Sequence, residues 1–279
     1  MEPGRSLRLQ SNLCRDDYPQ NSGWDFTNKV NRYYLFHGPA HGHRREVEIA
    51  LAEVFLPSRY LNVTAERGWW EVHALSRRRW TLLTRQSVEP GFYGDPSKVA
   101  EDVNNAIIKV LKKPNQEGSI TIEIGEQTHI AFSAAGLAIR LGLDLARLWG
   151  FASDRPMRAP PTHNFGREDR YLLRAPYTGN VHANKGALSI HCSSIEATMT
   201  GPRYTRTMQL VPWKPAEAGE AATSRHVVFP HPAYHRIVDR GLDHLSIRIT
   251  DSADVPVEFF GENTTVCLWV RDKSAAAHK

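Results

Sequence analysis

The chain has 279 residues, with 35 lysines and arginines against 30 acidic residues, so its formal net charge is +5. Hydrophobic residues make up 41% of the sequence and charged residues 23%, which is typical of a folded globular protein and excludes disorder, collagen-like and coiled-coil architecture for the whole chain. A chain of this length buries about 75% of its unfolded surface. No apolar run reaches the roughly 18 residues of a membrane-spanning helix, and residues 1–17 lack the apolar core of a signal peptide.

Strand-like segments recur from one end of the chain to the other. Residues 46–56 begin with alternating polar and apolar side chains, become apolar throughout and stop before Pro57, as a strand should. Residues 245–250 alternate strictly, which puts leucine and two isoleucines on one face and serine, arginine and threonine on the other. Residues 264–270 predict a central strand that is apolar on both faces. Further strands are predicted at residues 80–84, 119–124, 187–192, 205–211 and 226–229.

Two helices are expected between these strands. Asp95 followed by Pro96 is typical of a helix N-cap with proline at the first helical position, and Pro114 ends this helix. A second helix is predicted over residues 133–148, although two glycines weaken the pattern there. The apolar stripe of the first helix and the alternation of the C-terminal strands predict a core that contains Val103, Ile107, Val110, Ile247, Ile249, Val266 and Leu268.

The order of these elements predicts a mainly β protein, a single jelly-roll sandwich with one or two inserted helices. Residues 1–22 are expected to form an extended N-terminal arm, and residues 23–271 the jelly-roll domain with a helical insertion around residues 95–150. The proline-containing stretches 152–161 and 212–224 predict exposed loops, and residues 272–279 a frayed tail. A second small domain, built by the loop-rich middle of the chain, stays open.

The three cysteines, Cys14, Cys192 and Cys267, lie far apart and form no CxxC pair. A disulfide framework or a structural zinc site is therefore not expected. Cys192 and Cys267 both fall in strand-like runs, which predicts buried, inert thiols. This usage suits a reducing compartment or one in which redox chemistry plays no part.

Catalytic motifs are missing, because the chain contains no HExxH, GxSxG, P-loop or GxGxxG pattern. The best constellation is His37, His41 and His43 in a loop rich in glycine and proline, which is either a solvated loop or a site for zinc, nickel or copper. A cupin-type site would place its ligands on inward-facing strands, whereas this cluster lies between two strands. We expect no catalytic residues, metal or cofactor and no enzymatic activity; a metal-dependent jelly-roll enzyme is the alternative.

Other polar residues fit structural roles. His191 and Cys192 are neighbours on a predicted strand, so their side chains point to opposite faces and cannot act together. Asp251 and Asp254 precede Pro256 and are interpreted as turn formers. Prolines near three further histidines predict loop positions for His226, His231 and His235.

The densest basic run is Arg77, Arg78 and Arg79, directly before Trp80. Three arginines beside an indole could grip phosphate and stack on a base, or they could form a solvated edge or a contact with another protein. No helix-turn-helix, zinc-finger or basic-zipper signature accompanies the run. A basic structural protein that binds nucleic acid is therefore a second alternative.

Several segments, in a fixed order, resemble the penton (minor capsid) proteins of Polinton/Maverick elements and their adintovirus-like relatives. The chain carries Asp-Tyr-Pro-Gln-Asn at residues 17–21, a strand ending in Glu-Val-Phe-Leu-Pro at residues 53–57, and an aromatic turn at residues 91–93 followed by the predicted helix. A leucine-rich segment ending in Gly-Phe follows at residues 144–151. The C-terminal signature is the most specific part, and it covers residues 245–251, 256–259 and 265–271. The family usually has tryptophan before the valine of the first strand, where this chain has Arg45 and Glu46.

The resemblance implies a jelly roll that assembles as a homopentamer at the five-fold vertices of an icosahedral capsid. Its partner would be a double-jelly-roll major capsid protein, and its location the virion, assembled inside the host cell. Non-specific contact with packaged DNA is a further expectation, and no membrane span is implied. The expected interaction residues are Tyr18 and Pro19 in the arm, which would order on contact with neighbours, together with Arg77, Arg78 and Arg79.

Overall fold

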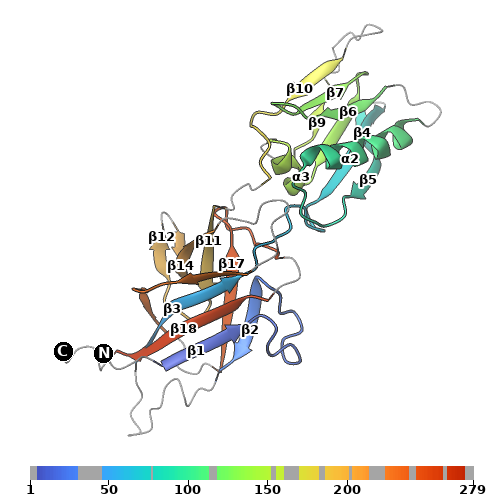
Figure 1. The fold of residues 1–279 in the computed structure, drawn as a ribbon. Helices are drawn as coiled ribbons and strands as arrows, with labels where there is room; N and C mark the ends of the chain where they lie inside the picture. The colour runs from blue at the N-terminus through green and yellow to red at the C-terminus, as the bar shows by residue number, and fades with distance from the viewer. Residues whose placement is uncertain are drawn as a thin grey trace. The chain divides into compact units, whose positions relative to one another are not determined.

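The computed structural model describes residues 5–30, 46–76, 78–112, 118–151, 155–159, 170–181, 186–200, 203–213, 224–238, 243–259 and 263–273. The chain divides into two compact units (Figure 1). Unit 1 comprises residues 1–60 and 184–279, and unit 2 comprises residues 61–183. Unit 2 is therefore an insertion within unit 1, and it is larger than the helical insertion expected around residues 95–150.

Two large antiparallel sheets form the main part of unit 1. One has the order β1-β18-β3-β15, with β16 also pairing with β3, and the other has the order β14-β11-β17-β2. Figure 1 shows β1, β18 and β3 side by side. The strands of both sheets are β1 (Arg5–Gln10), β2 (Asp25–Lys29), β3 (Val47–Leu56), β11 (Ala187–Cys192), β14 (Thr207–Pro212), β15 (Arg225–Val228), β16 (Tyr234–Arg236), β17 (His244–Thr250) and β18 (Thr265–Asp272).

The order of these strands is that of a jelly roll. Numbered along the chain, the eight positions are β1, β2, β3, β11, β14, β15 together with β16, β17 and β18. The first position pairs with the eighth, the second with the seventh, the third with the sixth and the fourth with the fifth. The eighth also pairs with the third, and the seventh with the fourth. This is a long antiparallel hairpin folded into two four-position sheets, which confirms the predicted mainly β, jelly-roll class.

The N-terminal segment is part of this fold and not a separate extended arm. β1 pairs with β18 from Arg5 opposite Val270 to Gln10 opposite Thr265. The alternation of the strand puts Leu9 in the core, where it is 1% exposed. Asn28 holds the following turn, since its Oδ1 accepts a hydrogen bond from the Gln10 amide at 2.7 Å and its Nδ2 donates to the Gln10 carbonyl at 3.0 Å.

The two C-terminal strands confirm most of the predicted core. Ile247, Ile249, Val266 and Leu268 are all fully buried. β18 is central, between β1 and β3, as predicted. Only one of its two faces is fully buried, although the sequence predicted an apolar environment on both. Trp269 is 39% exposed and Cys267 is half-buried, and both alternate along β18 with the buried residues Val266, Leu268 and Val270.

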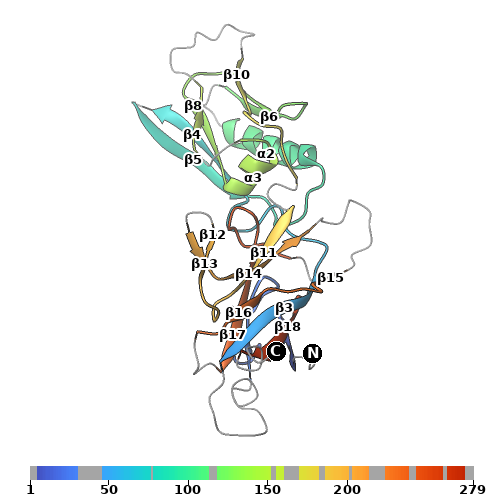
Figure 2. The same cartoon turned by 90° about the vertical axis from the view of Figure 1, so that its left-hand side faces the viewer.

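Unit 2 pairs two small sheets with two helices. Its sheets have the orders β5-β4-β8-β9 and β10-β7-β6. The elements are β4 (Trp69–Ser76), β5 (Arg79–Ser87), α2 (Pro96–Leu111), β6 (Ile120–Glu123), β7 (His129–Phe132), β8 (Leu137–Leu141), α3 (Leu143–Leu148), β9 (Met157–Arg158) and β10 (Tyr171–Arg174). Figure 2 shows α2 and α3 among these strands, and one hydrophobic core joins residues of both helices and both sheets.

The first predicted helix is confirmed as α2. Asp95 caps it by accepting a hydrogen bond from the Ser97 amide at 2.9 Å. Val103 and Ile107 are buried as expected, whereas Val110 is only half-buried and Leu111 takes its place in the core.

The second predicted helix is wrong over most of its length. Residues 137–141 form the strand β8, which pairs with β4 and β9, and the helix α3 covers only Leu143–Leu148. Two glycines explain the difference. Gly136 has a φ of +76°, which suits a turn before the strand. A Cβ atom on Gly142 would meet the Arg67 carbonyl oxygen at 2.1 Å, so only glycine fits between β8 and α3.

The two predicted loops and the tail are described in part. Within residues 152–161, Met157 and Arg158 form β9, while residues 152–154, 160 and 161 lie outside the described residues. Within residues 212–224, Trp213 is buried, and residues 214–223 lie outside the described part. Asp272 still belongs to β18, and residues 274–279 are not described. No helix in the described segments is long and apolar enough to span a membrane.

Candidate interaction surface

The arginine run lies at the turn between β4 and β5. Arg78 occupies this turn with a φ of +65°, and Arg79 is the first residue of β5; both are exposed. Arg77 lies outside the described residues. Among the described residues, the guanidinium that covers Trp80 is that of Arg158 of β9, whose Cζ lies 4.9 Å from the ring centre. An arginine that is distant in sequence from the run therefore lies over the indole of Trp80.

One face of the β5-β4-β8-β9 sheet collects such arginine and tryptophan side chains. Along β4, Trp70 and Val72 belong to the core, and the residues between them point to the opposite face. Strand pairing puts Arg85 of β5 and Arg140 of β8 directly across from Glu71 of β4. We define the arginine–tryptophan face by Trp69, Trp80, Leu82, Arg85, Arg140 and Arg158.

Glu71 is the anchor of this face. Its side chain is 7% exposed, and its carboxylate lies 3.3 Å from Nη1 of Arg85 and 3.8 Å from Nη1 of Arg140. Nε2 of His73 lies 3.1 Å from Oε2 of the same carboxylate. A buried carboxylate is costly to leave unpaired, so its contacts with Arg85 and Arg140 favour keeping both guanidinium groups at Glu71.

The same two arginines cover Trp69. Cζ of Arg85 lies 4.4 Å from the ring centre and Cζ of Arg140 lies 5.1 Å from it. At these distances a guanidinium is attracted to the ring face. Each of the two indoles, Trp69 and Trp80, is therefore covered by at least one guanidinium group. Stacking on the ring restricts the directions in which the N–H groups of that guanidinium can point.

Tyr18 and Pro19 lie in the turn between β1 and β2. The Tyr18 amide donates a hydrogen bond to the Cys14 carbonyl at 2.8 Å, and its half-buried ring lies 6.4 Å from that of His244. Pro19 is exposed. Asn21 closes the turn, since its Nδ2 donates to the carbonyls of Leu13 and Thr27 at 3.0 and 2.9 Å. Tyr18 and the arginine run belong to different units.

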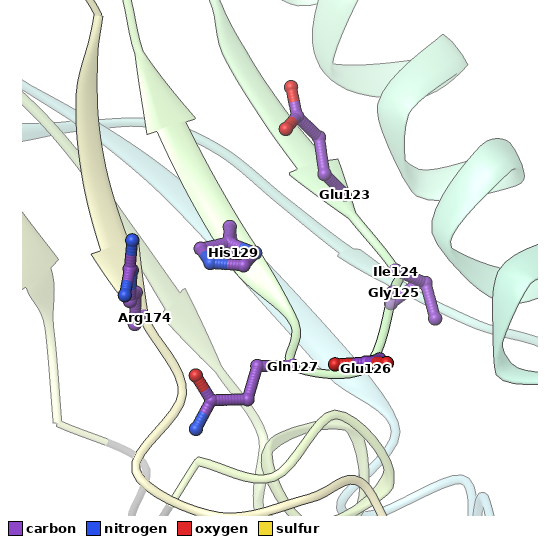
Figure 3. A pocket seen from close by; sticks show the side chains of 7 residues that line it. All are labelled: Glu123, Ile124, Gly125, Glu126, Gln127, His129 and Arg174. Carbon is purple, nitrogen blue, oxygen red and sulfur yellow. The ribbon is translucent and has the colours of Figure 1, made fainter.

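A shallow depression of about 450 Å³ lies at the turn between β6 and β7 (Figure 3). Strand pairing places Glu123, His129 and Arg174 in one row across three neighbouring strands. Glu123 also forms a 3.3 Å ion pair with Arg170. The row offers one acid, one imidazole and one guanidinium on an open surface, and no nucleophile among its lining residues stands beside a base.

The remaining sequence candidates have structural roles. His191 lies between the hydroxyls of Thr250 and Thr207, at 2.9 and 3.0 Å, and burial lowers its pKa. Burial raises the pKa of the Cys192 thiol to about 11, which fits the predicted inert thiol. Cys267 is only half-buried, with its pKa also raised by burial.

Among the predicted turn and loop residues, the prediction is confirmed for Asp251 and wrong for His226 and His235. The Asp251 carboxylate accepts hydrogen bonds from the amides of Ala253 and Val255, at 2.9 and 3.0 Å, which confirms its role as a turn former. His226 and His235 are not loop residues, since they lie on β15 and β16. His226 stacks on Phe55 with ring centres 4.1 Å apart, a contact that only the pairing of β15 with β3 creates.

The histidine cluster at residues 37, 41 and 43 lies outside the described residues. Within the described segments, no group of three or more histidine, cysteine, aspartate or glutamate side chains could hold a metal ion.

Sequence reasoning missed the arginines that build the arginine–tryptophan face. Arg140 was assigned to a helix and Arg158 to a loop, so their approach to β4 could not be inferred. The available signal was the alternation of residues 69–75, in which Trp70, Val72 and Ala74 face one side. That pattern predicts β4 and would have placed Glu71 on the opposite face.

Comparison with solved structures finds 18 matching chains, among them chains from mavirus and the Sputnik virophage. No family model and no curated protein sequence matches the chain. The crystal structure of the mavirus penton protein has a TM-score of 0.41 and 9% identity, covering 96% of this chain and 99% of that one. The cryo-EM structure of the Sputnik virophage gives a TM-score of 0.39 and 10% identity over 99% of both chains. Both scores are low, so the jelly-roll assignment rests on the strand order of unit 1.

Proposed function

We propose that this protein is a non-enzymatic structural capsid protein that forms the five-fold vertices of an icosahedral shell. One observation carries the proposal: the residues of the C-terminal penton-like signature form the seventh and eighth strands of the jelly roll. Residues 245–250 lie on β17, and residues 265–271 lie on β18. The most specific of the segments that resemble the penton family thus form an interior strand in each of the two large sheets of unit 1.

A vertex protein needs lateral surfaces for copies of itself, and unit 1 offers one on an extension of the β11–β14 hairpin. Among the described strands, β12 (Thr198–Thr200) and β13 (Arg203–Thr205) pair only with each other. Met199 and Tyr204 stand opposite one another on this ribbon and are 70% and 78% exposed. An isolated two-stranded ribbon is marginally stable in water, so burial against a second copy would stabilise it.

The assembly that follows is a homopentamer surrounded by a double-jelly-roll major capsid protein in the virion. The arginine run at the β4–β5 turn would be available for non-specific contact with packaged DNA. Cryo-EM of particles formed by co-expression with such a major capsid protein tests the location. We expect density for this chain at the vertices, and density at the faces or none at all would contradict the proposal.

The hairpin extension can be tested without the partner. The double variant Met199→Ser, Tyr204→Ser removes two exposed side chains, so its melting temperature should stay within about 1–2 °C of the wild type. Its pentamer should dissociate at concentrations where the wild type stays assembled. Leu172→Ser is the matched control, because Leu172 is 46% exposed on β10 of unit 2. Equal pentamer content in all three proteins would refute the role of the ribbon.

The two alternatives make different predictions. A metal-dependent enzyme that uses His37, His41 and His43 requires stoichiometric zinc, nickel or copper in the purified protein. A nucleic-acid-binding protein requires affinity for any duplex that falls steeply with salt concentration. The structural proposal predicts metal well below one equivalent per chain.

A further inference from the structure

The charge of the β5-β4-β8-β9 sheet is strongly one-sided. Its four strands carry Arg79, Arg85, Arg140 and Arg158 and contain no lysine. Glu71 is the one acidic residue on them, and it is buried against two of these arginines. Strand register places Arg85, Arg140 and Arg158 on the same face as Glu71, whereas Arg79 lies on the opposite face. The face with Glu71 therefore carries three arginines against one acidic residue from its own strands.

Apolar side chains lie among these arginines. Leu75 of β4 is 37% exposed and Leu82 of β5 is 49% exposed, although these two strands pair with each other in the sheet. Strand pairing puts Leu75 opposite Trp80 and Leu82 opposite His73. Arginine and tryptophan are enriched at the centres of protein–protein interfaces, and the exposed leucines beside them add apolar surface that a partner could bury.

The indole rings argue against nucleic acid as the occupant. Base stacking needs an open aromatic face, but Trp69 already holds Arg85 and Arg140, and Trp80 holds Arg158. On the ring faces that these guanidinium groups cover, a base would have to displace them. A carboxylate would not displace the guanidinium from the ring. It can accept two hydrogen bonds from the N–H edge of the guanidinium while the guanidinium stays stacked on the indole.

We propose that the arginine–tryptophan face binds a segment of another protein in which acidic residues flank a large apolar side chain. The carboxylates pair with Arg158 and with the arginines held by Glu71, and the apolar side chain covers Leu82 and Leu75. This inference concerns unit 2 and goes beyond the proposed capsid role.

Three fluorescein-labelled twelve-residue peptides test the chemistry by fluorescence anisotropy. They are three repeats each of Glu-Leu-Glu-Gly, Glu-Ser-Glu-Gly and Lys-Leu-Lys-Gly. The full-length protein should bind the first peptide at least tenfold more tightly than either of the others. A 20-base-pair DNA duplex is the competing probe, and tighter binding of the duplex than of the first peptide at 150 mM salt would assign the face to nucleic acid and overturn the proposal.

Two exposed arginines of unit 2 provide the matched variants. Arg158→Glu should weaken binding of the Glu-Leu peptide at least tenfold, and Arg158→Lys should weaken it less, because lysine keeps the charge but loses the bidentate edge. Arg174→Glu makes the same charge change on β10, away from this sheet, and should change binding less than twofold. The proposal fails if the wild type does not bind the peptide or if both glutamate variants lose binding equally. Because no assembly is measured, its failure is distinct from failure of the capsid proposal.

Discussion

Replacing Leu9 by alanine tests whether the N-terminal strand belongs to the jelly roll. Leu9 is 1% exposed and stands opposite Val266 in the pairing of β1 with β18. Removing a buried leucine side chain leaves a cavity and costs about 2–5 kcal/mol. For a domain of this size, each kcal/mol lowers the melting temperature by about 2–4 °C. With a loss of about 3 kcal/mol, the transition of unit 1 should fall by about 6–12 °C.

Differential scanning calorimetry measures this shift, and Leu13→Ala is the control. Leu13 lies in the turn after β1 and is 43% exposed, so the same chemical change should cost less than about 0.5 kcal/mol. An unchanged melting temperature for Leu9→Ala would mean that residues 5–10 are not packed in the core. An extended arm, free until it meets a neighbouring capsomer, would then be the better description.

Three further predictions follow from burial and assembly. Ile107→Ala should lower the free energy of unfolding by about 3 kcal/mol, since Ile107 is fully buried. The control is Ile108→Ala, which should cost less than about 0.5 kcal/mol because Ile108 is 40% exposed. Urea titrations measure both losses, and similar losses for the two variants would contradict the packing of α2. Cys192, with a pKa raised to about 11 against an ordinary value of 9.0, should resist iodoacetamide at pH 8 while half-buried Cys14 is labelled, and equal labelling rates would disprove its burial. Because unfolded Cys192 deprotonates first, its contribution to stability is complete below pH 9 and is lost as the pH rises toward 11. The ribbon variant Met199→Ser, Tyr204→Ser should weaken the pentamer without lowering the melting temperature.

Local patterns predicted the elements that carry their own signals. Asp95, Pro96 and the apolar stripe of α2 encode a capped amphipathic helix within one stretch of chain, and strict alternation encodes β17 in the same way. β1 carries a similar signal in Leu7 and Leu9, but arginine and polar neighbours on the other face made it resemble a solvated arm. The burial of Leu9 depends on β18, more than 250 residues away, which no local pattern reveals.

The interaction surface could not be predicted for the same reason. Arg85, Arg140 and Arg158 lie on three different strands, and only the register of β4 with β5 and β8 brings two of them to Glu71. The misassigned helix at residues 133–148 removed β8 from the expected sheet. Trp80 was singled out beside the arginine run, but the described guanidinium over its ring comes from a two-residue strand inside an expected loop.

The oligomeric state of the purified protein tests the central claim most directly. Each chain has a mass of 31.5 kDa, so native mass spectrometry of a pentamer should give five times that mass, and negative-stain images should show five-fold rings. A monomer that persists at high protein concentration, or rings of another symmetry, would contradict the assignment of this jelly roll to the five-fold vertices.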